Sequence, residues 1–514
     1  MKLLRLYLGD YRVLRDLRID FGPPSSNGDA LQRSSSYALD FLVGVNGTGK
    51  STVLRAIVDL IQELEGNPVI SFPFEMEYEL GANNDKRTVK ISNRADETSE
   101  GTIPSVGPLQ VWVNSDLTQW SNDFLPTRVV AFTTGSEAEW EQPRDADTLT
   151  PGTPDDIRNL TELEQALREL PGRPARVETD DSHPLQSSRF LLIKAQQLPL
   201  VTLCGLLTDF AAEEDPEDRR LHQALKEAKV GTLRGFSLKF RMNQGVTSPT
   251  DREEVDRLAQ RATRALRFGA DHLLIFDLTE REHTVAQQIL TEFSDGLRLF
   301  ETLARLATPV ADQQPILREI NLFLERPLVS RRPGEKREQP PLHLLEWLSD
   351  GEQSFLGRLC LFSLLGETEA LILLDEPEVH FNDYWKRQIV HLLDHALTGR
   401  HSHVLISTHS SITLTDVPRE DIVVLDRSVN YTSSAFHPRI QTFAADPSDI
   451  MVHVFGAPQA SGAQSVARIQ EVLEVTPSRV PEERTDQLRR LLGQVSPGYW
   501  SYRIRRELLG IERQ

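Results

Sequence analysis

Apolar residues recur along this chain with the periods of strands and helices. Leu3 to Leu8 and Val13 to Phe21 have the pattern of two strands near the start. Ala38 to Val43 is a mainly apolar run, typical of a buried strand, and Thr52 to Leu64 repeats apolar residues at helical spacing. A buried strand is therefore predicted to lead through a short turn into a helix.

Alternation with a period of two follows this helix. Apolar residues occupy every second position at Phe72, Phe74, Met76, Tyr78 and Leu80. Further strands are predicted at Val89 to Ile91, Leu109 to Val113 and Arg128 to Phe132. Together these strands are predicted to form an antiparallel, β-rich lobe.

The middle of the chain is predicted to be an insertion. Gly135 to Pro184 is acidic and rich in Pro and Gly, with a helical pattern only at Ile157 to Leu170, so we expect it to be mobile. Phe190 to Ile193 has the pattern of another core strand, and an apolar helix follows through Cys204 to Phe210.

Helical spacing then dominates. Val255, Leu258, Ala262 and Leu266 share one face of a predicted helix. A series with heptad spacing follows at Ala286, Leu290, Phe293, Leu297, Phe300 and Ala304. Since this series is shorter than the three or four heptads of a coiled coil, we predict a helical lid packed on itself.

Two buried strands of the last third end in polar residues. Ala370 to Leu374 is fully apolar and is followed by Asp375 and Glu376, and His403 to Ile406 leads to His409. In an open α/β sheet, ligands bind at the carboxyl ends of the strands. These three side chains are therefore predicted to lie at a ligand site.

The charge balance restricts the partners that this chain can bind. Its 57 basic and 76 acidic residues give a net charge of −19, so any nucleic-acid contact needs a local basic surface. Cys204 and Cys360 lie in apolar runs without metal-ligand spacing, as buried thiols do. No apolar run reaches the roughly 18 residues of a membrane span, and we expect a cytoplasmic protein without a membrane partner.

The turn after the first buried strand has the chemistry of a phosphate-binding loop. Its spacing is G-x4-G-K-S, and its glycines let successive N–H groups face one point at the start of a helix. Lys50 would reach the β- and γ-phosphates, and Ser51 would coordinate Mg²⁺. The predicted nucleotide contacts are Gly44, Asn46, Gly47, Thr48, Gly49, Lys50, Ser51 and Thr52.

The later motifs complete a hydrolytic site. Asp375 suits holding Mg²⁺ together with Ser51, and Glu376 suits orienting and deprotonating a water molecule. His409 at a strand end is predicted to hydrogen-bond the γ-phosphate. Leu348 to Gln353 forms a helix start whose free N–H groups can hold an anion.

These motifs, in this order, resemble the ATP-binding-cassette (ABC) type of P-loop ATPase in its SMC- and RecF-like branch. The resemblance implies an α/β fold: an ABC-type P-loop NTPase head with a RecA-like mixed sheet and an antiparallel β-lobe, an inserted helical lid, and a small C-terminal helical extension. The implied division is 1–134 and 341–430 for the two halves of the head, 135–340 for the insertion, and 431–514 for the extension.

The resemblance also implies that ATP is held between two copies of the chain. Ser349, Gly351 and Glu352 would cap the γ-phosphate of an ATP bound by the second subunit, and His380 and Asn382 match the D-loop that touches the partner's site. The family's Q-loop glutamine is not identified, and its candidates are Gln110, Gln196 and Gln197.

A narrower resemblance is to bacterial defence ATPases, meaning the restriction-system-associated AAA family and the ATPase subunits of Septu and retron systems. It rests on Leu348 to Glu352, Asp375 to Asp383 and Gln441 to Ile450. This resemblance implies a homodimeric or larger ATPase that controls a separately encoded effector, a nuclease, and has no nuclease centre itself.

The alternative is a DNA-repair clamp of the RecF type, which acts by binding DNA. Basic and aromatic residues together suit phosphate and base-stacking contacts. The candidates are Arg326, Arg331, Arg332, Lys336 and Arg337, and the C-terminal group Arg489, Arg490, Tyr499, Trp500, Tyr502, Arg503, Arg505 and Arg506. For the C-terminal group, a solvated helix face with Trp500 buried stays open as the simpler interpretation.

Overall fold

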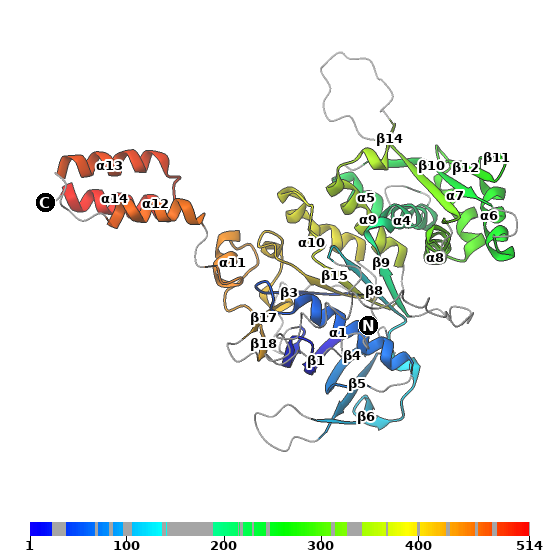
Figure 1. The fold of residues 1–514 in the computed structure, drawn as a ribbon, viewed down its shortest axis with the longest axis horizontal. Coiled ribbons are helices and arrows are strands. Elements are labelled where there is room, and N and C mark those ends of the chain that lie inside the picture. Colours follow the sequence, from blue (N-terminus) through cyan, green and yellow to red (C-terminus); the bar gives the residue numbers. More distant parts are fainter. Residues whose placement is uncertain are drawn as a thin grey trace, which may run out of the picture. The chain divides into compact units, whose positions relative to one another are not determined.

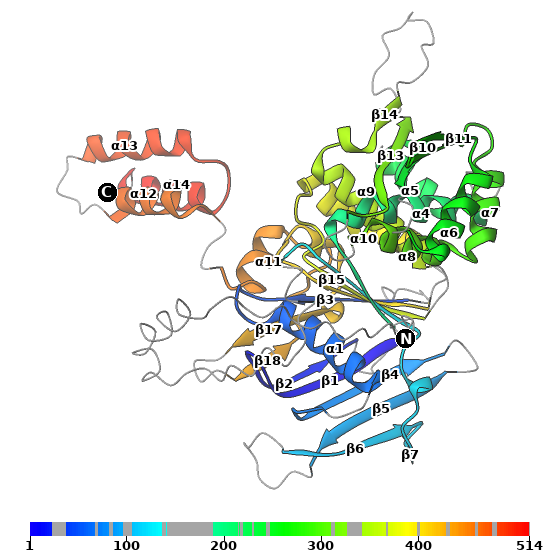
Figure 2. The same ribbon diagram turned by 45° about the vertical axis from the view of Figure 1, so that its right-hand side comes forward.

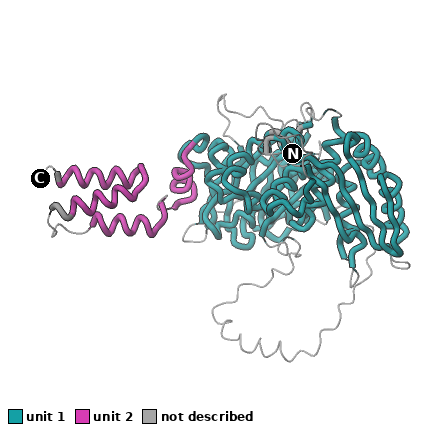
Figure 3. The backbone as a smooth tube through the Cα atoms, turned by 90° about the horizontal axis from the view of Figure 1, so that it is seen from above, with its two compact units in different colours: residues 1–444 teal, residues 445–514 magenta. Residues whose placement is uncertain are grey.

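The computed structural model places most of the chain in two compact units, Met1–Ala444 and Ala445–Gln514 (Figure 3). It describes residues 1–22, 37–66, 70–81, 86–95, 105–135, 140, 189–213, 215, 219–228, 231–242, 247–309, 314–325, 342–365, 369–397, 401–427, 432–457, 461–474 and 481–512. Almost all of the predicted acidic insertion, including its helix candidate Ile157 to Leu170, and the basic cluster Arg326 to Arg337 lie outside the described residues.

A seven-stranded sheet forms the centre of the first unit (Figure 1). Its order is β18 (Ser433–Phe436), β17 (Ile422–Arg427), β3 (Ala38–Val43), β16 (His403–Ser407), β15 (Ala370–Asp375), β8 (Arg128–Thr133) and β9 (Phe190–Ile193). All neighbours are parallel except β17 and β18. The carboxyl ends of β3, β16, β15 and β8 therefore meet at one edge.

The second sheet is the predicted antiparallel β-lobe. Its order is β2 (Leu14–Asp20), β1 (Lys2–Tyr11), β4 (Phe74–Leu80), β5 (Arg87–Arg94), β6 (Val106–Val113) and β7 (Asp116–Thr118). Arg128 to Phe132, which was predicted to belong to this lobe, lies instead in β8 of the central sheet, where it pairs in parallel with β15 and β9. The alternation predicted for β4 is confirmed, because its apolar residues are buried. The glutamates of β4 form ion pairs with basic side chains on or beside the neighbouring strands: Glu75 with Lys90, Glu77 with Arg5 and Glu79 with Lys86.

Helix α1 (Lys50–Glu65) packs in one hydrophobic cluster with both of these sheets. It is buried nearly all round and carries a buried ion pair, with 2.7 Å between Arg55 Nε and Asp59 Oδ1. The Tyr11 hydroxyl of β1 donates a hydrogen bond of 2.5 Å to Asp59. Because buried charges are tolerated when they are paired, this network fixes α1, and with it Lys50, against the β-lobe.

The lid lies on the side of the central sheet opposite the β-lobe (Figure 2). It contains a third, antiparallel sheet in the order β11 (Arg264–Phe268), β12 (Asp271–Asp277), β10 (Thr232–Arg241), β13 (Leu317–Glu325) and β14 (Leu342–Leu344). Its helices are α4 (Leu198–Ala212), α5 (Arg220–Ala228), α6 (Pro249–Arg261), α7 (Glu282–Phe293) and α8 (Gly296–Ala307). The lid was predicted to be helical, and the structure adds an antiparallel sheet to its helices.

Two helical predictions in the lid were wrong in detail. Helix α6 ends at Arg261, so Leu266 lies in β11, and Gly269 with φ 64° begins the tight turn between β11 and β12. The heptad series is divided between α7 and α8, because Asp295 starts a new helix by accepting a hydrogen bond from the Arg298 N–H.

Close contact with helix α9 (Asp350–Leu365) links the lid to the head. A Cβ atom on Gly205 of α4 would lie 2.2 Å from the carbonyl oxygen of Cys360 on α9. Cys204 and Cys360 are both buried at this contact. The two helices approach so closely because residue 205 lacks a side chain.

We expect Gly205→Ala to lower the free energy of unfolding by about 1–3 kcal/mol, since the backbones of α4 and α9 must separate. Thermal unfolding followed by circular dichroism measures this. Gly66→Ala is the control in the same unit, because a Cβ there meets only ordinary contacts at 3.8 and 3.9 Å. Equal melting temperatures for the two variants would contradict the contact.

The second unit includes α11 (Pro447–His453) and three further helices, α12 (Ala463–Glu474), α13 (Pro481–Gln494) and α14 (Tyr499–Glu512). The three pack around a small core of Ile469, Leu488, Ile504 and Leu508. The predicted four-part division of the chain stays a prediction. Strand β18 extends the head sheet past residue 430, and the boundary between the compact units follows Ala444. Within the described residues, no helix has both the length and the apolarity to cross a membrane.

Candidate functional site

The glycine-rich loop joins β3 to α1 in a conformation that needs its glycines. Gly44, Gly47 and Gly49 have φ values of 152°, 85° and 98°. A Cβ on Gly44 would lie 2.4 Å from the carbonyl oxygen of Leu425, and one on Gly49 would lie 2.5 Å from the Leu14 side chain. The Thr48 hydroxyl donates to the carbonyl of Val45 at 2.9 Å and stabilises the turn.

Lys50 is buried at the start of α1 and folds back over this loop. Its ammonium donates to the carbonyl oxygens of Gly44 at 3.0 Å and Val45 at 3.4 Å. Burial lowers the pKa of Lys50, and the charges of Glu376 and Asp375 oppose this shift. Among the described residues, no carboxylate lies within ion-pair distance of this ammonium, so its charge is available to an anion bound by the loop.

Asp375 is the centre of a group of hydroxyls. Ser51 donates to its Oδ1 at 2.9 Å, and Thr133 donates to its Oδ2 at 3.3 Å. The Ser407 hydroxyl also donates to Oδ1. Hard oxygen donors are the ligands that Mg²⁺ prefers, so Ser51 and Asp375 fit the predicted ion.

Glu376 and His409 face each other beside this group. The distance between His409 Nε2 and Glu376 Oε1 is 3.0 Å, and both side chains are about one-third exposed. Glu376 has φ 49°, and its N–H donates to the Ser407 carbonyl at 3.0 Å. Burial lowers the pKa of His409 and the charge of Lys50 adds to this, whereas the carboxylates of Glu376 and Asp375 oppose it.

Glu378 supports the loop that carries His409. Its buried Oε1 accepts hydrogen bonds from the Thr408 hydroxyl and, at 3.2 Å, from the His409 N–H. Burial raises the pKa of this carboxyl group. The sequence motifs predicted Asp375, Glu376 and His409, but not the supporting roles of Thr133, Ser407 and Glu378.

Arg358 of α9 is a buried cation close to Glu378. Its guanidinium carbon lies 4.9 Å from the ring centroids of both Phe132 and Phe381. Burial lowers the pKa of Arg358 to about 9, and the charge of Glu378 opposes this. No sequence motif includes Arg358, although it is the one basic residue of α9.

The residues predicted to act on the ATP of a second subunit make local contacts within this chain. Ser349 and Glu352 cap the start of α9: the Ser349 N–H and hydroxyl donate to Glu352 Oε2 at 2.9 and 3.0 Å, and the Ser349 oxygen accepts from the Glu352 N–H at 3.3 Å. A Cβ on Gly351 would lie 2.6 Å from the His380 carbonyl oxygen. Asn382 accepts from the Trp385 N–H at 2.9 Å and caps α10 (Asp383–Leu397). The residues predicted to cap the partner's γ-phosphate, Ser349, Gly351 and Glu352, are called the signature below. These contacts hold the signature and the D-loop against each other.

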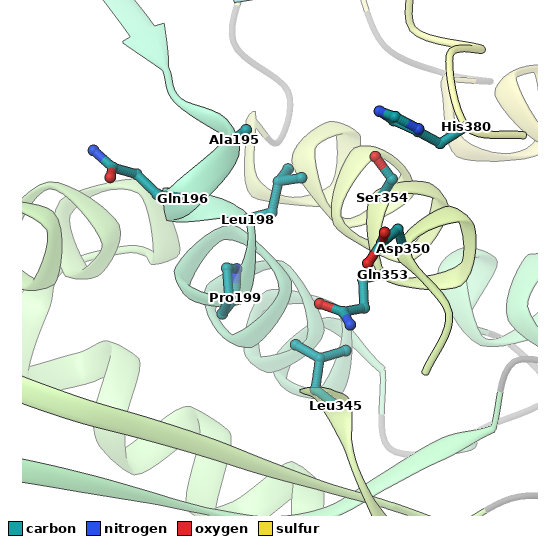
Figure 4. A pocket seen from close by; sticks show the side chains of 9 residues that line it. All are labelled: Ala195, Gln196, Leu198, Pro199, Leu345, Asp350, Gln353, Ser354 and His380. Carbon is teal, nitrogen blue, oxygen red and sulfur yellow. The ribbon is translucent and has the colours of Figure 1, made fainter. Parts of the chain in front are cut away.

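A pocket of about 350 Å³ lies at this helix start (Figure 4). Its lining includes Gln196, Asp350, Gln353 and His380. Of the other Q-loop candidates, Gln197 accepts a hydrogen bond from the Lys194 N–H at 3.0 Å, and Gln110 lies on β6 of the β-lobe. On β8, the strand beside β15 that precedes the lid, the side chain that reaches Asp375 is Thr133 instead.

Comparison with known families gives one match. Residues 209–416 match a family model described as "AAA domain, putative AbiEii toxin, Type IV TA system". The match spans less than half of the chain, from the lid through α9, β15 and β16, and does not include the glycine-rich loop. No curated protein matches the chain.

Solved structures similar to the chain include three SMC heads. The SMC head domain from Thermotoga maritima has 13% identity and a TM-score of 0.32, covering 86% of this chain and 100% of that chain. An SMC head bound to the C-winged helix domain of ScpA has 11% identity and a TM-score of 0.31, with 85% and 98% covered. An SMC head domain with an extended coiled coil, bound to the C-terminal domain of ScpA derived from Pyrococcus furiosus, has 12% identity and a TM-score of 0.31. This match covers 85% of this chain and 96% of that chain.

Proposed function

We propose that this chain is an ABC/SMC-like P-loop ATPase, which binds ATP between two copies of itself and hydrolyses it to ADP and phosphate; the match of residues 209–416 to an AAA domain supports the ATPase part. The observation that supports the proposal is the cluster at the carboxyl edge of the central sheet. It brings together Lys50, Ser51, Asp375, Glu376 and His409 from three separate stretches of the sequence.

Each side chain has a role in this reaction. Lys50 and the N–H groups of the loop hold the phosphates, for which Lys50 must leave the carbonyls of its own loop. Mg²⁺, when held by Ser51 and Asp375, supplies positive charge beside the β- and γ-phosphates. Glu376 accepts a proton from the attacking water. His409, which the sequence predicted to hydrogen-bond the γ-phosphate, lies 3.0 Å from Glu376 and is proposed to orient it.

The second copy supplies Ser349 and Gly351 to the γ-phosphate. Support comes from the start of α9, where Ser349 is exposed and the D-loop residue His380 packs against Gly351. Light scattering measures the mass: we expect a dimer with ATP and a monomer with ADP. For Ser349→Arg, whose long cation would obstruct the partner's phosphate, we expect a monomer in both states. A wild-type mass that does not respond to ATP would contradict the shared site.

The pH dependence of hydrolysis follows from the environment of His409. Because its pKa is lowered from the ordinary 6.5, His409 is neutral at pH 7. Protonation would turn its contact with Glu376 into an ion pair and weaken the base. We therefore expect a rate that is flat from about pH 7 to 8 and falls only at pH values below 6.5.

Rates of phosphate release across this range measure the effect, with His409→Gln as the comparison, since glutamine can keep the hydrogen bond to Glu376 without titrating. We expect the acid decline assigned to His409 to be absent in this variant. A decline centred above pH 6.5 in the wild type would contradict the assignment.

We further propose that the ATPase regulates a separately encoded effector, a nuclease, in cytoplasmic anti-phage defence. The family model that matches residues 209–416 is described as part of a toxin–antitoxin system, which supports a role in defence. Within the described residues, no cluster of three or more His, Cys, Asp or Glu side chains could hold a metal ion for a nuclease. Incubating the purified chain with plasmid and phage DNA and Mg²⁺ or Mn²⁺ tests this: we expect intact DNA, and cleavage without a partner would contradict it.

A further inference from the structure

Helix α14 presents aromatic rings and arginines to solvent. Tyr499, Tyr502 and Leu509 are 62%, 61% and 54% exposed. With Arg506, which is also exposed, they follow the spacing of a single helix face. Among the large apolar side chains of the described residues, these are some of the most exposed, although water is a poor environment for such rings.

The apolar face of α14 is already used elsewhere. Ile504 and Leu508 are buried in the core of the three-helix bundle, and Trp500 packs against that core. The simpler interpretation, a solvated helix face with Trp500 buried, is therefore partly correct, because Trp500 is partly buried against this core. It does not account for Tyr499 and Tyr502, which contribute little to the core.

Positive charge accompanies the exposed rings. Residues 499–506 carry Arg503, Arg505 and Arg506 and no acidic residue, in a chain with a net charge of −19. Within the described part of the chain, none of the three has a carboxylate within ion-pair distance. Arg503 instead donates to the Tyr499 hydroxyl at 3.3 Å, which keeps cation and ring side by side.

We propose that this face of α14, formed by Tyr499, Tyr502, Arg503, Arg505, Arg506 and Leu509, binds single-stranded nucleic acid. Arginines supply phosphate contacts, and exposed tyrosine rings supply platforms on which unpaired bases stack. A duplex already stacks its bases and would use only the arginines. This binding is separate from the proposed ATPase and needs no nucleotide.

Other anionic partners fit this face less well. A membrane surface needs a helix with an exposed apolar face, and the aliphatic residues of α14 other than Leu509 point into the bundle or lie at its edge. An acidic protein would pair with the arginines but would give no reason for two tyrosines exposed beside them. Single-stranded DNA and RNA share the chemistry that both features require.

Fluorescence anisotropy of the full chain with labelled oligo(dT), oligo(U) and a DNA duplex, without ATP, tests the proposal. We expect both single strands to bind more tightly than the duplex. About three phosphate contacts predict a slope near −2 for log affinity against log salt. The DNA and RNA arms identify which strand is preferred.

Tyr502→Ala combined with Arg506→Glu should weaken single-strand binding at least about tenfold and make the salt slope shallower. Both residues are exposed, so the melting temperature should not change. The matched control is Phe268→Ala with Arg264→Glu, which removes an exposed ring and reverses an exposed arginine on β11 and should bind as the wild type does. The proposal is overturned if no single strand binds at low salt, if both double variants bind alike, or if the full chain binds duplex DNA or anionic vesicles more tightly than it binds single strands.

Discussion

Glu376→Gln is expected to slow ATP hydrolysis by roughly 100- to 10,000-fold while leaving ATP bound, because the amide cannot accept a proton from water. Glutamine has the size of glutamate and can keep the hydrogen bond to His409, 3.0 Å away. The groups that hold phosphate, Lys50 and the glycine-rich loop, are not altered. The ATP-bound dimer should therefore accumulate.

Phosphate release and a fluorescent-nucleotide titration measure the two halves of this prediction separately. Glu420→Gln is the matched control, because it makes the same change at a carboxylate that contacts Arg419 in the short helical turn before β17. It should hydrolyse ATP at the wild-type rate. If Glu376→Gln retained hydrolysis, or lost ATP affinity in proportion to its rate, Glu376 would not be the base.

Lys50→Ala is expected to weaken ATP binding at least roughly 100-fold, since hydrogen bonds to a charged group each contribute about 1.5–3 kcal/mol and this ammonium can make two or more. Its position at the helix start, buried and without a carboxylate in ion-pair distance among the described residues, leaves it available to phosphate. The substitution removes both the charge and the donor.

Titration calorimetry with ATP and Mg²⁺ measures this loss. Lys90→Ala is the control, because Lys90 lies on β5 of the β-lobe and pairs with Glu75. It should leave the affinity unchanged. Equal affinities for Lys50→Ala and the wild type would show that the loop does not hold the phosphates.

The sequence could predict those parts of the fold that depend on residues close together in the chain. Gly44, Gly47 and Gly49 occupy positions with positive φ, so the spacing of the loop reports its shape directly. The apolar run before Asp375 likewise predicts β15 and the end at which its carboxylates lie. The predicted α/β head with its β-lobe is confirmed for this reason.

Contacts set by strand order could not be predicted in the same way. Asp375 is in register with Ser407 on β16 and with Thr133 on β8, and this pairing places both hydroxyls on its carboxylate. Nothing near Thr133 in the sequence indicates which strand lies beside it. The helix predicted to include Leu266 was wrong for a related reason. Leu266 continues the helical spacing of the preceding residues, but the turn at Gly269 and the pairing with β12 place it in a strand.

The central claim, that two copies share each ATP, can be tested by mixing two inactive variants. Lys50→Ala has no working loop and Ser349→Arg has no working signature, so each alone should hydrolyse no ATP. A mixed dimer joins the intact loop of one to the intact signature of the other. An equimolar mixture should therefore recover hydrolysis, up to about half of the wild-type rate, since neither variant pairs with itself around ATP and each mixed dimer has one working site of two. A mixture as inactive as its components would contradict the shared site.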